Sequence, residues 1–207
     1  MGVLGSAFNP PHLGHLALAQ EAWAQLELAE VVLVPTGRAP HKEIEADPGA
    51  DVRLEMTRLA VEGDERLRVS EVETERDEPS FSYRTLELLR ERRPDEELVF
   101  VMGADAAAGL ESWRSPERIL ELAGLGVAER KGGGERSAVE AALERLGGGG
   151  RVEFLDMPHI EVSSSMLRER VAAGRPIRYL VPGPVAELIA ARGLYAEAGT
   201  SRGVPGA

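Results

Sequence analysis

The chain alternates short unbroken apolar runs with longer segments in which apolar residues recur every three or four positions. A compact run rich in β-branched residues is typical of a buried parallel strand, and the longer spacing is typical of a helix packed on one side. The apolar runs lie at residues 2–4, 31–34, 67–72, 98–102, 125–129 and 151–155. The helical spacings lie at residues 13–28, 53–62, 82–93, 106–110, 116–122, 135–146, 163–174 and 184–192. This alternation predicts an α/β fold with a doubly wound, mostly parallel, Rossmann-like sheet.

The length and the order of these segments predict one domain followed by a short tail. A chain of 207 residues can bury a full core within a single domain. We expect this domain to span residues 1–195, with a small helical subregion at about 163–195. Residues 196–207 are small and polar, so we expect them to be disordered.

Composition excludes several classes of function. The formal net charge of −11 disfavours a broad nucleic-acid-binding surface, which needs clustered Lys and Arg. The chain has no cysteine, which excludes disulfides, thiolate catalysis and thiolate metal sites. No basic leader precedes the first apolar run, and no apolar run approaches membrane-spanning length. We therefore expect a cytoplasmic protein with neither nucleic acid nor membrane among its partners.

The segment after the first apolar run carries the strongest chemical signal. Residues 5–15 read Gly-Ser-Ala-Phe-Asn-Pro-Pro-His-Leu-Gly-His, a turn that leads from a strand into a helix. A helix start offers unpaired N–H groups and a partial positive charge, which suit phosphate. His12 and His15 share one side of this start and can stabilise charge on phosphate oxygens, while Gly14 lets a ligand approach the backbone. The alternative is a helix that merely carries two histidines.

Two further segments combine cations or hydroxyls with strand or helix ends. Lys42 follows the second strand, where open α/β sheets bind ligands, and a compact cation suits a triphosphate. The alternative for Lys42 is a solvated loop. Ser163 begins a predicted helix with Ser164 and Ser165 in its first turn, and Arg168 follows one turn later, a combination that can hold phosphates. The alternative for these serines is an ordinary helix cap.

Three residues elsewhere were also considered for the site, and two of them, Asp105 and Trp113, have two interpretations each. Asp105 follows a strand and a glycine, so it can bind a ribose hydroxyl or help to place magnesium, or it can cap a helix. Trp113 lies in a polar loop, where it can stack on an aromatic substrate ring or belong to the core. His159 precedes the serine cluster and is interpreted as structural.

Together these segments resemble the nucleotidylyltransferase superfamily with an H-x-G-H signature, and more narrowly the bacterial nicotinate-nucleotide adenylyltransferase family. The resemblance runs from Leu4 to Tyr195 in the family's order. The segments that carry it are residues 5–15, 40–42, 79–86, 103–105 with Leu110 and Trp113, 162–168, and 177–182. The family's activity implies transfer of adenylyl from ATP to nicotinate mononucleotide, giving deamido-NAD and pyrophosphate. It also implies Mg²⁺, bound mainly through the ATP phosphates, and in-line attack without a covalent enzyme intermediate.

The same resemblance implies roles for individual residues. The catalytic residues would be His12, His15, Lys42 and Arg168. The residues that bind ATP would be Gly5, Ser6, Ala7, Phe8, Gly14, Gly103, Asp105, Ser164 and Ser165. Those that bind nicotinate mononucleotide would be Ser82, through its backbone N–H, together with Tyr83, Trp113 and Arg114. No residue is assigned as a metal ligand, and the oligomeric state stays open, a homo-oligomer included.

The chain departs from the family at several positions, and other functions remain open. Ser6 and Ala7 stand where the family usually has a second glycine and a Thr or Ser, and Asn9 replaces the more usual Asp. Ser82 stands for a usual Thr, which leaves the choice of acceptor less constrained than the adenylyl transfer. The alternatives are transfer to nicotinamide mononucleotide or phosphopantetheine, and a non-catalytic nucleotide-binding regulator of the same fold. Phosphopantetheine would leave the segments around Ser82 and Trp113 without a role.

Overall fold

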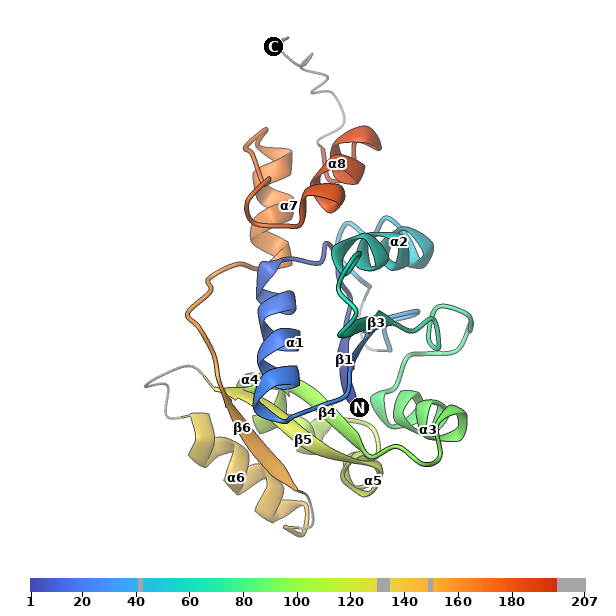
Figure 1. Ribbon diagram of the computed structural model, residues 1–207, viewed down its shortest axis with the longest axis vertical. Coiled ribbons are helices and arrows are strands. Elements are labelled where there is room, and N and C mark those ends of the chain that lie inside the picture. The colour runs from blue at the N-terminus through green and yellow to red at the C-terminus, as the bar shows by residue number, and fades with distance from the viewer. Residues whose placement is uncertain (41–42, 130–134, 149–150, 197–207) are drawn as a thin grey trace.

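The computed structural model describes residues 1–40, 43–129, 135–148 and 151–196, and its core is one parallel sheet (Figure 1). The strands are β1 (Gly2–Ser6), β2 (Val31–Pro35), β3 (Leu67–Val69), β4 (Leu98–Gly103), β5 (Ala123–Glu129) and β6 (Val152–Asp156). They pair in the order β3-β2-β1-β4-β5-β6, and every pair is parallel. The order reverses direction at β1, so the carboxyl ends of β1 and β4 form the switch point where such sheets bind ligands.

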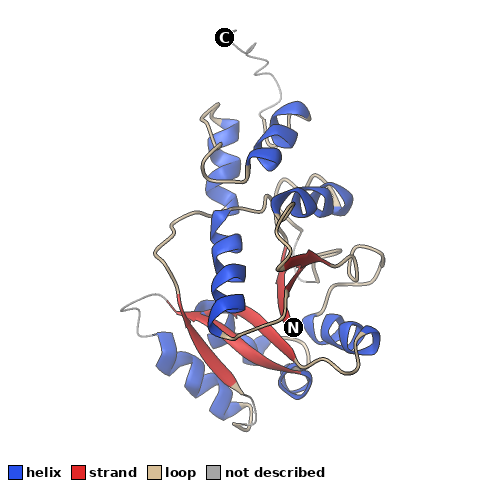
Figure 2. Ribbon diagram, viewed as in Figure 1, coloured by secondary structure: helices blue, strands red, loops and turns tan. Residues whose placement is uncertain are grey.

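Helices cover both faces of the sheet, as Figure 2 shows by colour. They are α1 (Leu13–Gln25), α2 (Ala50–Ala60), α3 (Ser82–Arg92), α4 (Ala104–Ala108), the 3₁₀ turn η1 (Leu110–Ser112), α5 (Pro116–Leu122), α6 (Glu135–Arg145), α7 (Ser164–Ala172) and α8 (Gly183–Ala191). Side chains of α1 pack on one face of the sheet, and side chains of α3, α4, α5 and α6 pack on the other. The described part of the chain contains no helix long and apolar enough to cross a membrane.

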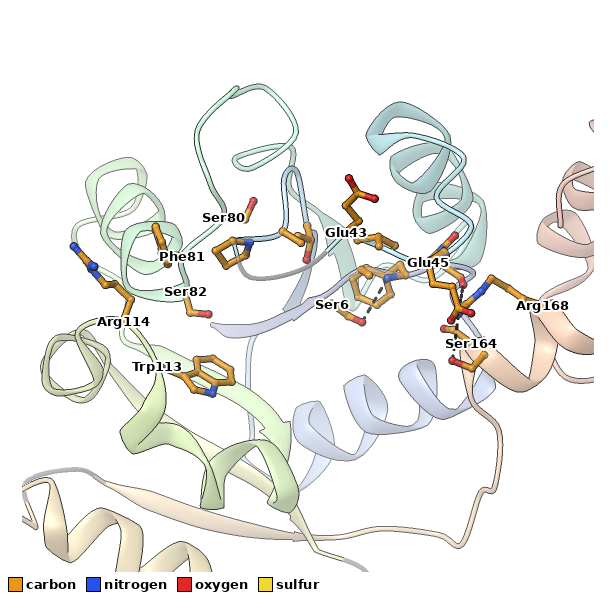
Figure 3. Close-up of a pocket in the computed structure, with 18 of the residues that line it drawn as sticks. Ser6, Glu43, Glu45, Ser80, Phe81, Ser82, Trp113, Arg114, Ser164 and Arg168 are labelled. Carbon is orange, nitrogen blue, oxygen red and sulfur yellow. Dashed lines mark hydrogen bonds and ion pairs between the residues drawn. The ribbon is translucent and has the colours of Figure 1, made fainter.

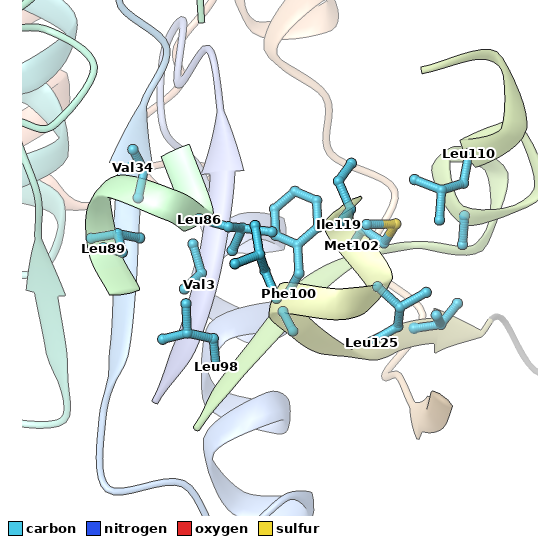
Figure 4. Close-up of a cluster of buried hydrophobic side chains, with 14 of the residues drawn as sticks. Val3, Val34, Leu86, Leu89, Leu98, Phe100, Met102, Leu110, Ile119 and Leu125 are labelled. Atoms are coloured by element: carbon cyan, nitrogen blue, oxygen red, sulfur yellow. The ribbon is translucent and has the colours of Figure 1, made fainter. Parts of the chain in front are cut away.

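Alternation along each strand assigns its side chains to the two faces. Val3 of β1 and Phe100 of β4 contribute to the larger core, which Figure 4 shows with Leu86 and Leu89 of α3. Leu4 and Val101, one position further along the same two strands, contribute to the core under α1. Successive residues of a strand point to opposite faces, so unbroken apolar runs are what a sheet covered on both faces requires.

The C-terminal helices attach at the carboxyl edge of the sheet and form a third apolar cluster with α2. Leu167 of α7 and Val185 and Ile189 of α8 are buried in it together with Met56 of α2. The backbone N–H of Leu13 donates to the carbonyl of Leu180 at 3.2 Å, which joins the start of α1 to this cluster. The C-terminal helices therefore bring the start of α7 close to the segment between β1 and α1.

The predicted strands and helices all occur, with shifted ends. Helix α2 begins at Ala50 rather than at residue 53, because Gly49 donates to the Asp47 carboxylate at 2.9 Å and turns the chain with φ 100°. Strand β3 ends at Val69 instead of continuing to residue 72, and β5 begins at Ala123, two residues earlier than predicted. The single helix predicted at residues 106–110 is in fact α4 followed by η1. The predicted tail, residues 196–207, lies outside the described residues except for its first.

Candidate active site

A cavity of about 610 Å³ opens at the carboxyl edge of β1 and β2 (Figure 3). Its lining comes from the ends of these strands, the starts of α3 and α7 and the loop before α5. The lining residues are Ser6, Ala7, Phe8, Asn9, Thr36, Ala39, Pro40, Glu43, Ile44, Glu45, Ser80, Phe81, Ser82, Ser112, Trp113, Arg114, Ser164, Ser165 and Arg168. Ser82 and Trp113 lie at one end, Ser164 and Arg168 lie at the other, and Ser6 lies between them. Residues far apart in the sequence thus share one hollow, which we call the first cavity.

A second cavity of about 660 Å³ lies beside α1 and the end of β4. Gly14, Gly103 and Asp105 line it, three of the positions that the sequence assigned to ATP. Asp156 and Glu161 also line it, and its described lining contains no Lys or Arg. A hollow with carboxylates and no cation suits a neutral group that donates hydrogen bonds, such as a ribose or an amino group, better than it suits phosphate.

The segment between β1 and α1 links the two cavities. Ser6 to Asn9 line the first cavity, and Gly14 lines the second. Phe8 is fully buried in a left-handed conformation with φ 48°, which a bulky residue rarely adopts. The side chain of Asn9 donates to the carbonyl of Glu45 at 2.8 Å and accepts from the Tyr195 hydroxyl at 2.6 Å. A carboxylate at position 9 would lack the amide donor, so this chain's asparagine has a structural use.

The two histidines form a stacked pair at the start of α1. Their ring centroids lie 3.8 Å apart, and the His15 ring also meets the Phe8 ring edge to face at 4.9 Å. His15 Nδ1 accepts the backbone N–H of His12 at 3.3 Å. A ring nitrogen that accepts a hydrogen bond carries no proton, so the neutral His15 ring is protonated at Nε2. Within the described residues, the buried Nδ1 of His12 has no hydrogen-bond partner.

Burial keeps both imidazoles neutral near pH 7. It lowers the pKa of His12 to about 4, and burial followed by the charge of His12 lowers the pKa of His15 to about 3. A neutral imidazole can stabilise a phosphate only as an N–H donor and not as a cation. Full positive charge in the lining of the first cavity comes, among the described residues, from Arg114 and Arg168.

The same lowered pKa values predict an acid-sensitive fold. The unfolded chain binds protons on these rings below about pH 6.5, while the folded chain binds them only near pH 4 and pH 3. Stability is therefore complete above pH 6.5 and falls as the pH is lowered, by at most about 1.4 kcal/mol per pH unit for each ring. We expect the free energy of unfolding, measured by urea denaturation, to fall more between pH 7 and pH 5 in the wild type than in His15→Asn. Equal losses in the two proteins would show that His15 is not buried in its neutral form.

Gly14 lies against the His12 ring. A Cβ at this position would lie 3.1 Å from both Cε1 and Nδ1 of the His12 ring. This distance is tighter than an ordinary van der Waals contact, so a side chain at residue 14 would displace the ring. The predicted close approach of a ligand to Gly14 is compatible with its place in the second cavity, but it is not the only reason for the glycine.

The start of α7 presents hydroxyls and one guanidinium. Ser163 is the helix cap, with its side chain accepting from Met166 at 3.2 Å, while Ser164 donates to the carbonyl of Pro10 at 2.9 Å. Arg168 donates to the carbonyl of Asn9 at 3.0 Å and to the carboxylate of Glu45 at 2.6 Å. The cap interpretation is therefore right for Ser163, whereas Ser164, Ser165 and Arg168 line the first cavity.

The opposite end of the first cavity is aromatic. Trp113 packs edge to face on Phe100 of the core, with ring centroids 6.2 Å apart, and its exposed side lines the cavity, so both interpretations of this residue hold in part. Ser82 begins α3, and the first N–H groups of a helix have no acceptor within the helix. Arg114 also lines this end. Tyr83 does not reach either described cavity; its ring stacks on Phe81 at 6.0 Å and packs against the core.

The structure also locates several other residues that the sequence analysis considered for the site. Asp105 lies inside the first turn of α4 and Gly103 is the N-cap, so the cap interpretation of Asp105 is wrong. His159 is largely exposed, lines the second cavity and pairs with Glu161 at 3.2 Å. Gly5 lines neither described cavity. A Cβ at this position would lie 3.8 Å from the Phe100 ring, an ordinary van der Waals contact. Lys42 lies outside the described residues.

Arg53, whose side chain is fully buried beneath the first cavity, was not predicted as part of the site. Arg53 donates to the Asp47 carboxylate at 2.8 Å and to the carbonyls of Ala7 and Gly37 at 3.1 Å each, and it also donates to the carbonyl of Thr36. One buried cation thus joins the loops that follow β1 and β2. The only available signal was an arginine on the apolar side of an expected helix. An arginine is ordinarily interpreted as a solvent-exposed residue, so this signal did not point to a buried cation.

Glu73 and Gly37 form a second contact that the sequence did not predict. Glu73 accepts from the Thr85 hydroxyl at 2.6 Å and from the backbone N–H of Gly37 at 3.3 Å. Burial raises the pKa of Glu73, while these hydrogen bonds oppose the rise. A Cβ on Gly37 would lie 2.2 Å from the Glu73 carbonyl oxygen, so the two backbones meet only because residue 37 is glycine. The contact fixes the loop after β2 to the start of α3, and both line the first cavity.

Comparison with known proteins agrees with this arrangement. The chain matches the sequence model of the cytidylyltransferase-like family over residues 3–170, which places the fold and its site in that class of nucleotidyltransferases. A probable nicotinate-nucleotide adenylyltransferase of Exiguobacterium sibiricum is 39% identical over 95% of this chain and 98% of its own length. One of Rubrobacter xylanophilus is 37% identical over 98% of this chain and 95% of its own. The chain belongs to the nicotinate-nucleotide adenylyltransferase family.

A solved structure supports the fold. The nicotinic acid mononucleotide adenylyltransferase of Plasmodium falciparum, complexed with NaAD, superposes with a TM-score of 0.76 at 17% identity. The superposition covers 94% of this chain and 96% of that one. At this identity the likeness establishes the shared sheet and helix arrangement.

Proposed function

We propose that this protein transfers the adenylyl group of ATP to nicotinate mononucleotide, releasing pyrophosphate and forming deamido-NAD for NAD biosynthesis. The observation that carries the proposal is the first cavity. It joins an aromatic end at Ser82 and Trp113 to a phosphate-binding end at Ser164 and Arg168 within one hollow (Figure 3). The two ends match the two reactants, a pyridine nucleotide and a triphosphate. Family membership supports the same assignment.

The charges of the two cavities orient ATP. The second cavity offers the carboxylates of Asp105, Asp156 and Glu161 and no cation among its described residues, so the adenosine belongs there. The triphosphate then passes the start of α1, where His12 and His15 lie, toward Arg168 in the first cavity. We assign Lys42 to the outer phosphates on the family resemblance alone. Gly103 lines the second cavity beside Asp105 and belongs to the adenosine site.

The acceptor belongs at the aromatic end. Trp113 offers one side of its ring to the cavity for stacking on the pyridine, and Ser82 offers a helix N-terminal N–H for the nicotinate carboxylate. Arg114 adds positive charge to the same end. Tyr83 packs beside Phe81, so it would support the shape of this end and not touch the acceptor.

The reaction needs no nucleophile from the protein. The phosphate of nicotinate mononucleotide is already ionised and attacks the α-phosphorus of ATP, and pyrophosphate leaves with the electron pair of the broken P–O bond. The neutral rings of His12 and His15 act as N–H donors to phosphate oxygens that gain charge. Arg168 must exchange its bond to Glu45 for one to a phosphate, and the exposed Glu45 carboxylate can move aside.

Mg²⁺ fits this site only as a partner of ATP. The described residues contain no group of three or more His, Asp or Glu placed to hold a metal ion. Mg²⁺ commonly keeps several waters and binds through substrate phosphates, and when bound it neutralises phosphate charge. The ion would therefore enter with the triphosphate.

We place the reaction in the cytoplasm.

The direct test is detection of the product. The protein is incubated with ATP, Mg²⁺ and nicotinate mononucleotide, and the mixture is analysed by mass spectrometry. We expect equimolar deamido-NAD and pyrophosphate. Binding of ATP without any dinucleotide would contradict the proposal and favour the alternative, a non-catalytic nucleotide-binding regulator.

A further inference from the structure

Glu73 joins two segments that line the first cavity, although its own side chain lines neither cavity. One carboxylate oxygen, Oε2, accepts from the backbone N–H of Gly37 at 3.3 Å, in the loop after β2. The other oxygen, Oε1, accepts from the hydroxyl of Thr85 at 2.6 Å, one turn into α3. Glu73 therefore acts on a bound substrate through the segments that it holds together.

The loop after β2 has a second support, which the start of α3 shares only through this loop. Arg53 donates to the carbonyls of Thr36 and Gly37 and so fixes the loop from within the protein. Ser80, just before α3, accepts with its hydroxyl oxygen from the N–H groups of Gly37 at 3.1 Å and Arg38 at 3.2 Å. The N–H of Ser80 donates to the carbonyl of Arg38 at 2.8 Å. With the loop already fixed by Arg53, the segment that Glu73 positions is the start of α3.

The contacts of Glu73 call for a carboxylate. Both of its partners, the Gly37 N–H and the Thr85 hydroxyl, are donors, and each meets a different oxygen. An ionised carboxylate only accepts, with two oxygens, whereas an amide has one oxygen and presents N–H donors on its other side. Glutamine at position 73 would therefore satisfy one partner and oppose the other.

The first turn of α3 is the place where this positioning matters for the proposed function. Ser80, Phe81 and Ser82 follow one another along the first cavity (Figure 3). The proposed function assigns the Ser82 N–H to the nicotinate carboxylate. The strength of a hydrogen bond depends on its distance and angle, and a charged acceptor gains about twice as much from a well-aligned donor as a neutral one. A firmly held helix start thus favours an acid over its amide.

We propose that Glu73 is a positioning residue for acceptor choice. By holding the first turn of α3 to the loop after β2, it aims the Ser82 N–H at the carboxylate of the acceptor. The inference rests on the proposed function, because that function supplies the acceptor. Glu73 makes no bond to the substrate and exchanges no proton with it.

The test measures the ratio of kcat/KM for nicotinate mononucleotide to kcat/KM for nicotinamide mononucleotide, with saturating ATP and Mg²⁺. We expect Glu73→Ala to lower this ratio at least about fivefold, because the acid loses more than the amide when the Ser82 N–H is no longer aimed. Glu73→Gln keeps one acceptor oxygen and is expected to lower the ratio less. Thr85→Val removes the buried hydroxyl donor and keeps the side-chain size, so it should lower the ratio as well.

Glu75→Gln is the matched control. Its carboxylate pairs with Arg92 at the surface and lines neither cavity, so the ratio should stay that of wild type. Thermal melts establish that each variant is folded at the assay temperature, and Glu73→Gln carries the test if the alanine variant does not fold.

A merely structural role for Glu73 gives a different result. The variant would then lower kcat/KM for both acceptors by the same factor, and the ratio would not change. That outcome would overturn the inference while leaving adenylyl transfer intact. A wild type that forms no dinucleotide, or that uses both acceptors equally well, would instead overturn the proposed function.

Discussion

His15→Ala is expected to lower the turnover of adenylyl transfer at least about a hundredfold. The variant removes the Nε2–H donor that lies 3.3 Å from the Ser6 hydroxyl oxygen and that the proposed function assigns to the reacting phosphate. The ring is neutral, so the loss is that of a preorganised dipole and not that of a charge. Steady-state kinetics with saturating ATP measure the effect.

A second variant separates chemistry from folding. His15→Asn keeps an oxygen near the place of Nδ1, so it can still accept the backbone N–H of His12 and support the start of α1. We expect it to melt near the wild-type temperature and to lose activity as the alanine variant does. A near-normal rate in either variant would remove His15 from the charge-stabilising role.

Arg53→Ala is expected to cost about 3–5 kcal/mol of unfolding free energy. The substitution removes a fully buried guanidinium, so three backbone carbonyls lose its hydrogen bonds and the Asp47 carboxylate keeps only the Gly49 N–H of its two described donors. The loops after β1 and β2 then lose their common support, so ATP turnover should fall as well. Urea unfolding monitored by circular dichroism measures the change.

Arg58 provides the matched control on the same helix. Its side chain is 52% exposed, and it pairs with Glu71 at the surface. Such surface pairs contribute within about 1 kcal/mol, so Arg58→Ala should unfold close to wild type. Similar losses in both variants would show that burial of Arg53 is not what stabilises the two loops.

Most of the fold followed from the sequence because it depends on local patterns. Unbroken runs such as residues 31–34 and 98–102 fit only strands covered on both faces, and the structure confirms them as β2 and β4. Helix ends were less certain, since the start of α2 depends on the turn at Gly49 and on a hydrogen bond to Asp47.

The candidate site followed in part. His12, His15 and the serines before Arg168 were predicted because they lie at helix starts, where the fold itself places ligands. Ser164 and Ser165 line the first cavity, while the two histidines lie between the cavities at the start of α1 and stay predicted site residues. Arg53 and Glu73 were not found, because each gains its meaning from partners distant in sequence. The lowered pKa values of the two histidines were also beyond reach, since they arise from burial and, for His15, also from the charge of His12.

Acceptor choice is the most direct measure of the central claim. The protein is given ATP and Mg²⁺ with either nicotinate mononucleotide or nicotinamide mononucleotide, and pyrophosphate release is followed. A charge-assisted bond from a helix N-terminal N–H to the carboxylate stabilises the acid by about 1.5–3 kcal/mol over the amide. We predict a kcat/KM that favours the nicotinate form by about tenfold to a hundredfold. Equal rates would contradict the assignment of the acceptor, and no release with either substrate would contradict adenylyl transfer itself.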